Sequence, residues 1–332
     1  MKHGAGIYKM AKKLDCESSE IIDFSSNINS YNANITLTVT KEMLARYADS
    51  SYSDLKRVIA KKYEIKKKQM VLYNGATSAI FELIKSLKEK EIYLYAPLYG
   101  EYEKAAKLSD KNIHKINRFK NLHKIPKYDS TVVFVNPSTP DGKHYDLASL
   151  FKLWKQQNCT IILDESFLEF QNLKSLRNQI NSYKKLYIIQ SFTKFYACAG
   201  VRVGAIFSHK RNIKKLKTPL WNLSSFDVAY LTKKLQDTKF SNKSKTTHKK
   251  MKKELLELLK KSKLFSKIYK SDSNFILTKS QHAKKIFKHL YKNKILVRKC
   301  ESFDFLSDNY LRFAVKDTNS HKTLTKVLNE LT

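Results

Sequence analysis

The chain has 332 residues, of which 42% are hydrophobic and 12% aromatic, and it contains only 7 Gly and 5 Pro. This composition excludes collagen-like and broadly disordered proteins, and the length suits about two domains with a sizeable core. The chain carries 64 Lys and Arg against 30 Asp and Glu, a formal net charge of +34. This charge favours phosphate-bearing or nucleic-acid partners, although the lysine runs are spread along the whole chain instead of forming one stripe.

The cysteine pattern and the hydropathy of the chain indicate the cellular compartment in which the protein works. The four cysteines lie far apart without a CxxC pair, so the sequence indicates neither a zinc site nor a disulfide framework. The amino terminus contains no apolar stretch of the signal-peptide kind, and nowhere do about 18 uncharged apolar residues run together. We therefore expect a soluble cytoplasmic protein with no metal and no membrane partner.

Residues 71 to 207 alternate between short apolar runs and helical patterns. Five runs rich in β-branched and aromatic residues predict buried strands, at Glu91 to Tyr95, Thr131 to Val135, Thr160 to Leu163, Leu186 to Ile189 and Val203 to Phe207. The spacing i, i+3, i+4, i+7 predicts a helix, capped by Thr77 or Ser78, whose apolar face carries Ile80, Leu83, Ile84 and Leu87. This alternation predicts an α/β fold with a mainly parallel sheet covered on both faces.

The carboxyl-terminal third differs in character. It begins with a very basic stretch, Lys233 to Lys263, that carries a seam of leucines. It continues with predicted strands at Asn274 to Thr278, Ile295 to Arg298 and Tyr310 to Val315, with a helix after the first. We expect a large domain of residues 35–225 and a smaller α+β domain made of the amino-terminal arm, residues 1–34, together with residues 226–332.

Polar residues directly after predicted strands are candidate ligands, because open α/β sheets bind ligands at the carboxyl ends of their strands. Asn74-Gly75-Ala76-Thr77 opens a helix with small residues, which suits a phosphate cradle, although it is also ordinary turn chemistry. Asp164-Glu165 ends a buried strand, where an acid is costly unless it meets a positive partner or water. A simple strand-end turn is the alternative at both places.

Lys194 has the most informative setting. It lies between Thr193 and the aromatic pair Phe195-Tyr196, just beyond a strand, so it is expected to be partly desolvated. Desolvation lowers the pKa of a lysine and favours Schiff-base chemistry. Ser191 and Arg202 add anion ligands nearby. Two more strand-end turns are candidates for lining a pocket: Asn136 to Gly142, which is rigid and polar, and Pro97 to Tyr102, which carries an aromatic ring. A core or surface Tyr is the usual explanation for such a ring.

Taken together and in this chain order, these are the parts of a pyridoxal 5′-phosphate (PLP) site. The sequence resembles the fold-type I PLP-dependent enzymes of the aminotransferase superfamily over nearly its whole length. Within that superfamily it is most similar to threonine-phosphate decarboxylases of cobalamin biosynthesis and next to histidinol-phosphate aminotransferases. The stretches that carry this resemblance are His3 to Ile7, Asp23 to Asn29, Gly100 to Tyr102, Thr193 to Tyr196 and Ile295 to Arg298.

The resemblance implies a role for each matching residue. Lys194 would bind the cofactor covalently, Asp164 would pair with its pyridinium nitrogen, and Tyr99 would stack on its ring. The residues around the cofactor phosphate would be Gly75, Ala76, Thr77, Ser191 and Arg202. Arg312 would bind the substrate carboxylate, and the substrate phosphate would be bound by His3, Gly4, Asn27 and Arg298.

Two departures from the family pattern bear on the cofactor's phenolic oxygen. Where the family usually has Asn-Asn-Pro-Thr-Gly, this chain has residues 138–142, Ser-Thr-Pro-Asp-Gly, so Thr139 replaces the Asn that contacts the phenolic oxygen of the cofactor. A hydroxyl still donates one hydrogen bond, but with shorter reach. Phe167 stands where aminotransferases often have a Tyr at the same oxygen.

The resemblance favours decarboxylation of L-threonine O-3-phosphate, or of serine phosphate, to the amino-alcohol phosphate. The alternative within the same fold is transamination of histidinol phosphate or a similar phosphorylated amine. A third hypothesis, the least favoured, is a basic nucleic-acid-binding protein that uses Lys243 to Lys263. For either enzyme we expect a homodimer with no nucleic-acid partner.

Overall fold

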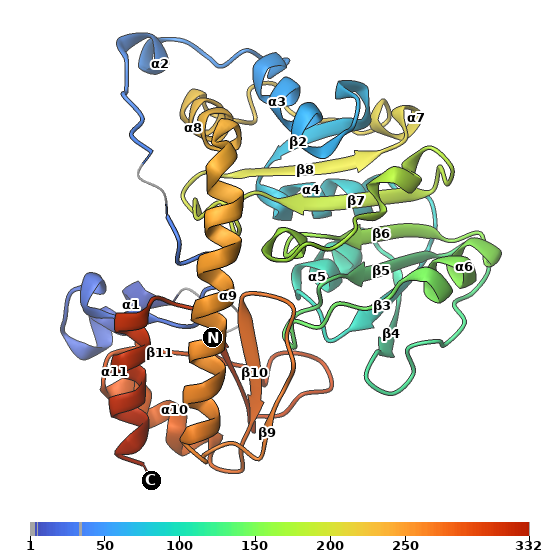
Figure 1. Ribbon diagram of the computed structural model, residues 1–332. Helices are drawn as coiled ribbons and strands as arrows, with labels where there is room; N and C mark the ends of the chain where they lie inside the picture. Colours follow the sequence, from blue (N-terminus) through green and yellow to red (C-terminus); the bar gives the residue numbers. More distant parts are fainter. Residues whose placement is uncertain (1–3, 5, 33–34, 332) are drawn as a thin grey trace.

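The computed structural model describes residues 4, 6–32 and 35–331 (Figure 1). Its helices are α1 (Ile7–Leu14), α2 (Lys41–Ala45), α3 (Ser53–Tyr63), α4 (Gly75–Ser86), α5 (Glu101–Leu108), α6 (Ala148–Gln156), α7 (Lys210–Ile213), α8 (Ser225–Gln236), α9 (Thr238–Lys261), α10 (Ala283–Lys292) and α11 (Thr318–Asn329). Its strands are β1 (Ile22–Asp23), β2 (Met70–Asn74), β3 (Glu91–Ala96), β4 (Asn112–Asn117), β5 (Thr131–Val135), β6 (Thr160–Asp164), β7 (Leu186–Ser191), β8 (Val203–Ser208), β9 (Lys267–Ile268), β10 (Phe275–Lys279), β11 (Ile295–Leu296), β12 (Arg298–Lys299) and β13 (Tyr310–Ala314).

A seven-stranded sheet dominates the first two thirds of the chain. Its order is β2-β8-β7-β6-β5-β3-β4, and only β8 runs antiparallel to its neighbours. The five strands predicted between residues 91 and 207 all lie in it, which confirms the α/β class and the mainly parallel sheet. β4 is an edge strand that the sequence analysis missed, because its residues, NIHKIN, do not alternate between apolar and polar.

Two apolar clusters cover the two faces of this sheet, as expected for strands buried on both sides. One face packs against helices α3, α6 and α8, with Leu55, Trp154 and Leu231 in the cluster. The other face packs against α4 and α5, with Ile80 and Ala105. The central strands are therefore packed on both sides.

The start of α4 differs from the prediction. We expected Thr77 or Ser78 to cap this helix, but it begins at Gly75, and Asn74 is the residue before its first turn. Gly75 adopts φ +75, which a residue with a side chain rarely does. The glycine turns the chain directly from β2 into the helix, so Ala76 and Thr77 lie in its first turn.

The smaller lobe is built around an antiparallel sheet of order β12-β13-β10-β9. We predicted one strand over Ile295 to Arg298, but these residues form two short strands in different sheets: β11 pairs in parallel with β1, and β12 pairs with β13. Through the β1–β11 pair, Ile22 of the amino-terminal arm lies beside Ile295. The arm is thus joined to the carboxyl-terminal lobe.

Helix α9 connects the two lobes, and in Figure 1 it runs from beside the large sheet to the small lobe. Phe240, near its start, belongs to a large-sheet cluster, whereas Leu255 and Leu259 belong to the core of the small lobe. The division of the chain at residue 225 remains a prediction. Within the residues that the structure describes, no helix has the length and apolarity needed to cross a bilayer.

Candidate active site

A cavity of about 320 Å³ lies at the carboxyl ends of the central strands, between the large sheet and the small lobe. Twelve of the site residues predicted from sequence line it: Gly4, Asn27, Ala76, Thr77, Tyr99, Thr139, Asp164, Ser191, Lys194, Arg202, Arg298 and Arg312. Gly75 is buried beside the cavity. His3 lies outside the described residues. The structure therefore brings together side chains that are up to about 300 positions apart in the chain.

Lys194 lies just beyond β7 and is half-buried in the cavity wall. Its Nζ donates a hydrogen bond to Ser191 Oγ at 3.1 Å and lies 5.6 Å from the centre of the Phe167 ring. Burial lowers the pKa of Lys194, Asp164 partly opposes this effect, and Arg202 and Arg312 reinforce it. A lowered pKa makes the neutral, nucleophilic amine available closer to neutral pH than in an ordinary lysine.

Asp164 ends β6 with both carboxylate oxygens bound. The Tyr102 hydroxyl donates to Oδ2 at 2.8 Å, and the backbone N–H of Ser166 donates to Oδ1 at 2.9 Å. Burial raises the pKa of Tyr102 well above its ordinary value, and the nearby Asp164 carboxylate raises it further. This hydroxyl therefore stays protonated and donates. The carboxylate is therefore fixed in one orientation toward the cavity.

Tyr102 is a site residue that sequence reasoning gave no role. It appeared only within the Pro97 to Tyr102 turn and the Gly100 to Tyr102 resemblance. The available signal was its place in the first turn of the helix that follows this strand-end turn. Its backbone N–H donates to the Tyr99 carbonyl at 3.1 Å.

The first turn of α4 and the segment before β8 approach each other very closely. A Cβ atom on Gly75 would lie 2.5 Å from an Arg202 side-chain nitrogen, and one on Gly204 would lie 2.3 Å from the backbone nitrogen of Ala76. No side chain caps the start of α4, which is a feature that favours an anion there. The Arg202 guanidinium, Thr77 and Ser191 at this end of the cavity suit a phosphate group.

Arg298 and Arg312 are register partners on β12 and β13, so two guanidiniums enter the cavity from one sheet. Arg312 donates to Thr139 Oγ1 at 3.0 Å and to the carbonyl of Ser25 at 3.1 Å. Burial lowers its pKa to about 10, so it remains a cation at neutral pH. Arg298 donates to Ser302 Oγ at 2.8 Å and lies over the Phe303 ring.

The amino-terminal arm closes the cavity on the side of these arginines. Asn29 anchors it, because its backbone N–H donates to the Lys194 carbonyl at 3.0 Å. Asn274 Nδ2 donates to the carbonyl of Asn27 at 3.0 Å. A Cβ on Gly4 would lie 2.4 Å from the Ser25 carbonyl oxygen, so the arm packs tightly upon itself.

These residues fit PLP. A buried amine, a fixed carboxylate, an aromatic ring and an anion cradle without room for extra side chains match its aldehyde, ring nitrogen, ring face and phosphate in turn. Two buried polar atoms of the lining residues, Asn27 Oδ1 and Arg312 Nε, have no hydrogen-bond partner within the part of the chain that the structure describes. Such atoms are costly unless a polar ligand meets them.

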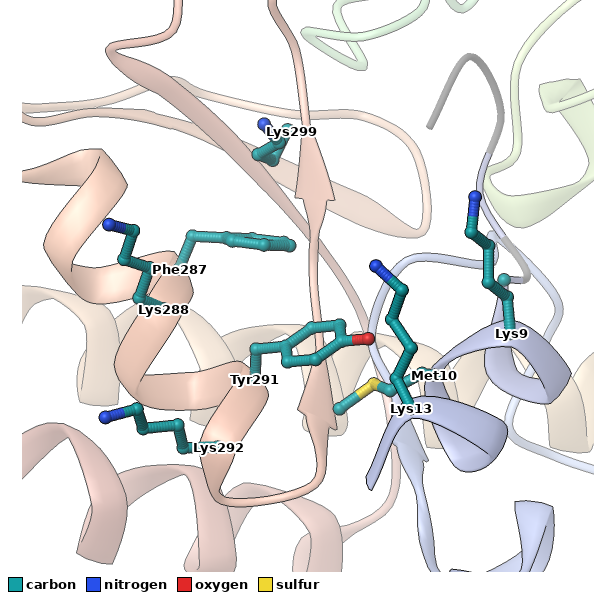
Figure 2. A pocket seen from close by; sticks show the side chains of 9 residues that line it. Lys9, Met10, Lys13, Phe287, Lys288, Tyr291, Lys292 and Lys299 are labelled. Carbon is teal, nitrogen blue, oxygen red and sulfur yellow. The ribbon is translucent and has the colours of Figure 1, made fainter. Parts of the chain in front are cut away.

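A second pocket, of about 380 Å³, lies between α1 and α10 and shares no lining residue with the first. Figure 2 shows the rings of Phe287 and Tyr291 projecting from α10 toward α1. Five lysines line this pocket: Lys9, Lys13, Lys288, Lys292 and Lys299. Only Lys299 is half-buried, and it pairs with Glu301 at 2.7 Å; the other four are exposed.

Comparison with known proteins gives matches over nearly the whole chain. Residues 19–331 match the family model described as aminotransferase class I and II. The adenosylcobalamin biosynthesis bifunctional protein CobDQ of Leptospira interrogans is 30% identical over 99% of this chain, which spans only 41% of that relative's length. The solved histidinol-phosphate aminotransferase of Clostridium acetobutylicum is 30% identical, with a TM-score of 0.82, over 94% of this chain and 99% of that one.

One further solved structure supports the fold alone. The L-threonine-O-3-phosphate decarboxylase of Porphyromonas gingivalis superposes with a TM-score of 0.81 at 17% identity, over 94% of this chain and 99% of that one. The superposition therefore shows that the two chains share one fold.

Proposed function

Because the chain belongs to the class I and II aminotransferase family, whose members use PLP, we propose that it decarboxylates L-threonine O-3-phosphate, or serine phosphate, to the corresponding amino-alcohol phosphate. One observation carries this proposal: two guanidiniums, Arg298 and Arg312, line the same cavity as the Lys194 amine. A substrate with two anionic groups, a carboxylate and a phosphate, matches this pair. The cobalamin context comes from the relative in Leptospira interrogans.

The proposed cofactor contacts follow the geometry of the cavity. Lys194 would bind the aldehyde carbon, Asp164 would bind the ring nitrogen, and Tyr99 would stack on the ring. Gly75, Ala76, Thr77, Ser191 and Arg202 would surround the phosphate. When bound, the cofactor supplies an electron-withdrawing ring that accepts the electron pair left by a broken bond at the substrate Cα. The Asp164 carboxylate, held by Tyr102, would accept a hydrogen bond from the ring nitrogen and favour its protonated form, which would strengthen that withdrawal.

The substrate is held from the small lobe. Arg312, anchored by Thr139 and the Ser25 carbonyl, binds the carboxylate. Arg298, with His3, Gly4 and Asn27 of the arm, binds the phosphate. The position in which Arg312 holds the carboxylate would decide between loss of CO2 and loss of a proton at Cα. Once the substrate amine had displaced it, the freed Nζ of Lys194 would supply the proton that Cα receives.

The alternative function is transamination of histidinol phosphate, or of a similar phosphorylated amine, with a 2-oxo acid. The 30% identity to the Clostridium acetobutylicum enzyme supports it. In this case Arg298 again binds the substrate phosphate, whereas Arg312 binds the carboxylate of the acceptor acid.

A direct assay separates the two reactions. The purified, PLP-loaded protein is incubated with threonine phosphate, with serine phosphate, and with histidinol phosphate plus 2-oxoglutarate, and CO2 and amino products are measured. The decarboxylase proposal expects CO2 and amino-alcohol phosphate in equal amounts from one of the first two. Glutamate formation without CO2 contradicts it and supports the alternative.

We further propose a cytoplasmic homodimer. All four cysteines are free, as in a reducing compartment. An apolar patch includes Tyr47 and Trp221, whose rings stack with their centres 4.2 Å apart although both are exposed. Leu44 and Leu220 are 71% and 70% exposed. We propose that a second copy of the chain covers this apolar patch. Sedimentation velocity of the parent protein and of Trp221→Lys tests this. We expect a dimer for the parent and a monomer for the variant.

A further inference from the structure

Arg118 is a buried cation that the proposed function does not use. It follows β4 at the edge of the large sheet and is only 3% exposed. Its guanidinium contacts three groups at once: it donates to the Pro97 carbonyl, donates to the Thr139 carbonyl at 3.3 Å, and forms an ion pair with Asp141. Its backbone N–H also donates to the Ala96 carbonyl at 3.0 Å.

These contacts join two turns that carry cavity residues. Pro97 precedes Tyr99 in the turn after β3, and Thr139 lies in the turn after β5. Tyr99 and Thr139 both line the cavity, whereas Arg118 does not. Arg118 therefore lies behind the cavity wall and ties together the two turns from which these side chains project.

Asp141 fixes the position of the Arg118 guanidinium. It is 2% exposed, it pairs with Arg118, and it accepts a hydrogen bond from Ser138 Oγ at 2.7 Å. A buried guanidinium needs such a partner, because removing one member of a buried pair leaves an uncompensated charge. The planar fork of Arg118 reaches both turns, which the single ammonium group of a lysine does not reproduce.

The residue types at positions 139 and 141 indicate what the Arg118–Asp141 pair does. Asp141 and Thr139 are both departures from the Asn-Asn-Pro-Thr-Gly pattern, and they are two residues apart. The Thr139 hydroxyl has a shorter reach than the amide that it replaces, so its backbone must be placed more accurately to reach the same atom. An ion pair bound to the Thr139 turn itself supplies that accuracy.

We propose that Arg118 is a positioning residue that, together with Asp141, holds the Tyr99 and Thr139 turns at the separation required by the cofactor ring. This inference rests on the proposed placement of Tyr99 and Thr139 at the cofactor, but not on the choice between decarboxylation and transamination. Arg118 contacts neither cofactor nor substrate and acts through the two turns.

The test compares PLP-loaded parent protein with Arg118→Lys and with the double variant Arg118→Met/Asp141→Leu, which removes both charges together. The readouts are PLP affinity, the pH at which the visible band of the bound cofactor changes, and thermal stability. In the double variant we expect a shifted pH midpoint and weaker PLP binding. We also expect its kcat/KM to fall on the order of 10²-fold, because Tyr99 and Thr139 would be displaced from the cofactor ring. In Arg118→Lys we expect a smaller shift of the pH midpoint.

Arg177→Met serves as a control, because Arg177 is a half-buried arginine near the sheet that pairs with the buried Glu165 at 3.2 Å and lines no part of the cavity. It is expected to lower thermal stability without moving the pH midpoint. If the double variant loses thermal stability but keeps the parent's pH midpoint and PLP affinity, Arg118 has only a structural role and the proposal is overturned.

A third variant keeps the inference testable if the double variant does not fold. Adding Thr139→Asn to Arg118→Lys restores the longer side chain, and we expect it to bring the pH midpoint back toward the parent value. A midpoint that stays where Arg118→Lys left it contradicts the proposal. Failure of the proposed site is distinguishable, because the parent protein itself would then show no visible band.

Discussion

The strand-end cavity and the pocket between α1 and α10 are both rich in cations but use them in opposite ways. In the cavity, Lys194, Arg298 and Arg312 are largely enclosed, and each charged group donates to a defined oxygen. In the α1–α10 pocket, four of the five lysines extend into solvent (Figure 2). Enclosure gives direction and shifted pKa values, whereas exposure gives only an attraction that salt screens. The following predictions test this contrast.

The largest effect is expected from Lys194→Ala. Without the buried amine the cofactor has no covalent partner, so the visible absorbance of the protein-bound cofactor and the turnover should both disappear. Lys13→Ala, in the α1–α10 pocket, is the matched control and should retain both. Borohydride reduction followed by peptide mapping should label Lys194; a label on any other lysine contradicts the site.

Asp164→Asn should lower turnover by about 10²-fold or more, because it removes a preorganised charge from an enclosed site. The neighbouring acid provides the comparison. Glu165 is also buried, but it pairs with Arg177 and accepts the Leu176 N–H at 2.9 Å. Glu165→Gln should therefore affect thermal stability more than turnover. Equal turnover in Asp164→Asn and the parent would exclude the proposed role of Asp164.

Arg298→Ala should raise KM for the phosphorylated substrate by roughly 10- to 100-fold, since hydrogen bonds to charged groups contribute about 1.5–3 kcal/mol. It should also remove the preference over the unphosphorylated amino acid. Lys299→Ala is the control, because the adjacent residue of β12 lines the α1–α10 pocket instead. If both variants lose selectivity equally, the net charge matters rather than the position of Arg298.

A smaller effect concerns stability and pH in the apoprotein. Burial lowers the pKa of Lys194, so the folded state holds this proton less tightly than the unfolded state. The resulting penalty is absent above the ordinary lysine pKa and grows as pH falls toward the folded value. Lys194→Met should thus raise the melting temperature by about 2–4 °C near pH 7 and by less near pH 10. A gain that is independent of pH would show that Lys194 carries no such penalty.

The smallest effect is expected at the α1–α10 pocket. Reversing two exposed charges, Lys9→Glu and Lys13→Glu, should lower kcat/KM for a phosphorylated substrate about twofold to threefold at low ionic strength, through weaker long-range attraction. The difference should vanish near 0.5 M salt, where charges are screened within a few ångströms, and kcat should not change. A salt-independent loss would indicate a specific anion site here.

The sequence predicted the parts of the site that follow from chain order. Lys194, Asp164 and Thr139 come directly after buried strands, so the parallel-sheet rule places them at one edge. It could not predict partners that meet through side-chain geometry alone. The Tyr102–Asp164 and Arg118–Asp141 contacts join residues of different elements, and no local pattern reports which side chains will face each other. Arg118 also follows β4, an edge strand that could not be recognised from its polar sequence.

The place of the amino-terminal arm has a consequence for how the active site is assembled during synthesis. Ile22 pairs with Ile295, and the Ser25 carbonyl accepts from Arg312, so these contacts join residues that are far apart in the order of synthesis. The large sheet, completed by Ser208, can form before Ile22 and Ser25 have these partners, while Asn29 already has its partner at Lys194. Contacts between such distant residues close late, because long loops must be ordered first. The lysine-bearing part of the site can therefore form before its arginine-bearing part has been synthesised.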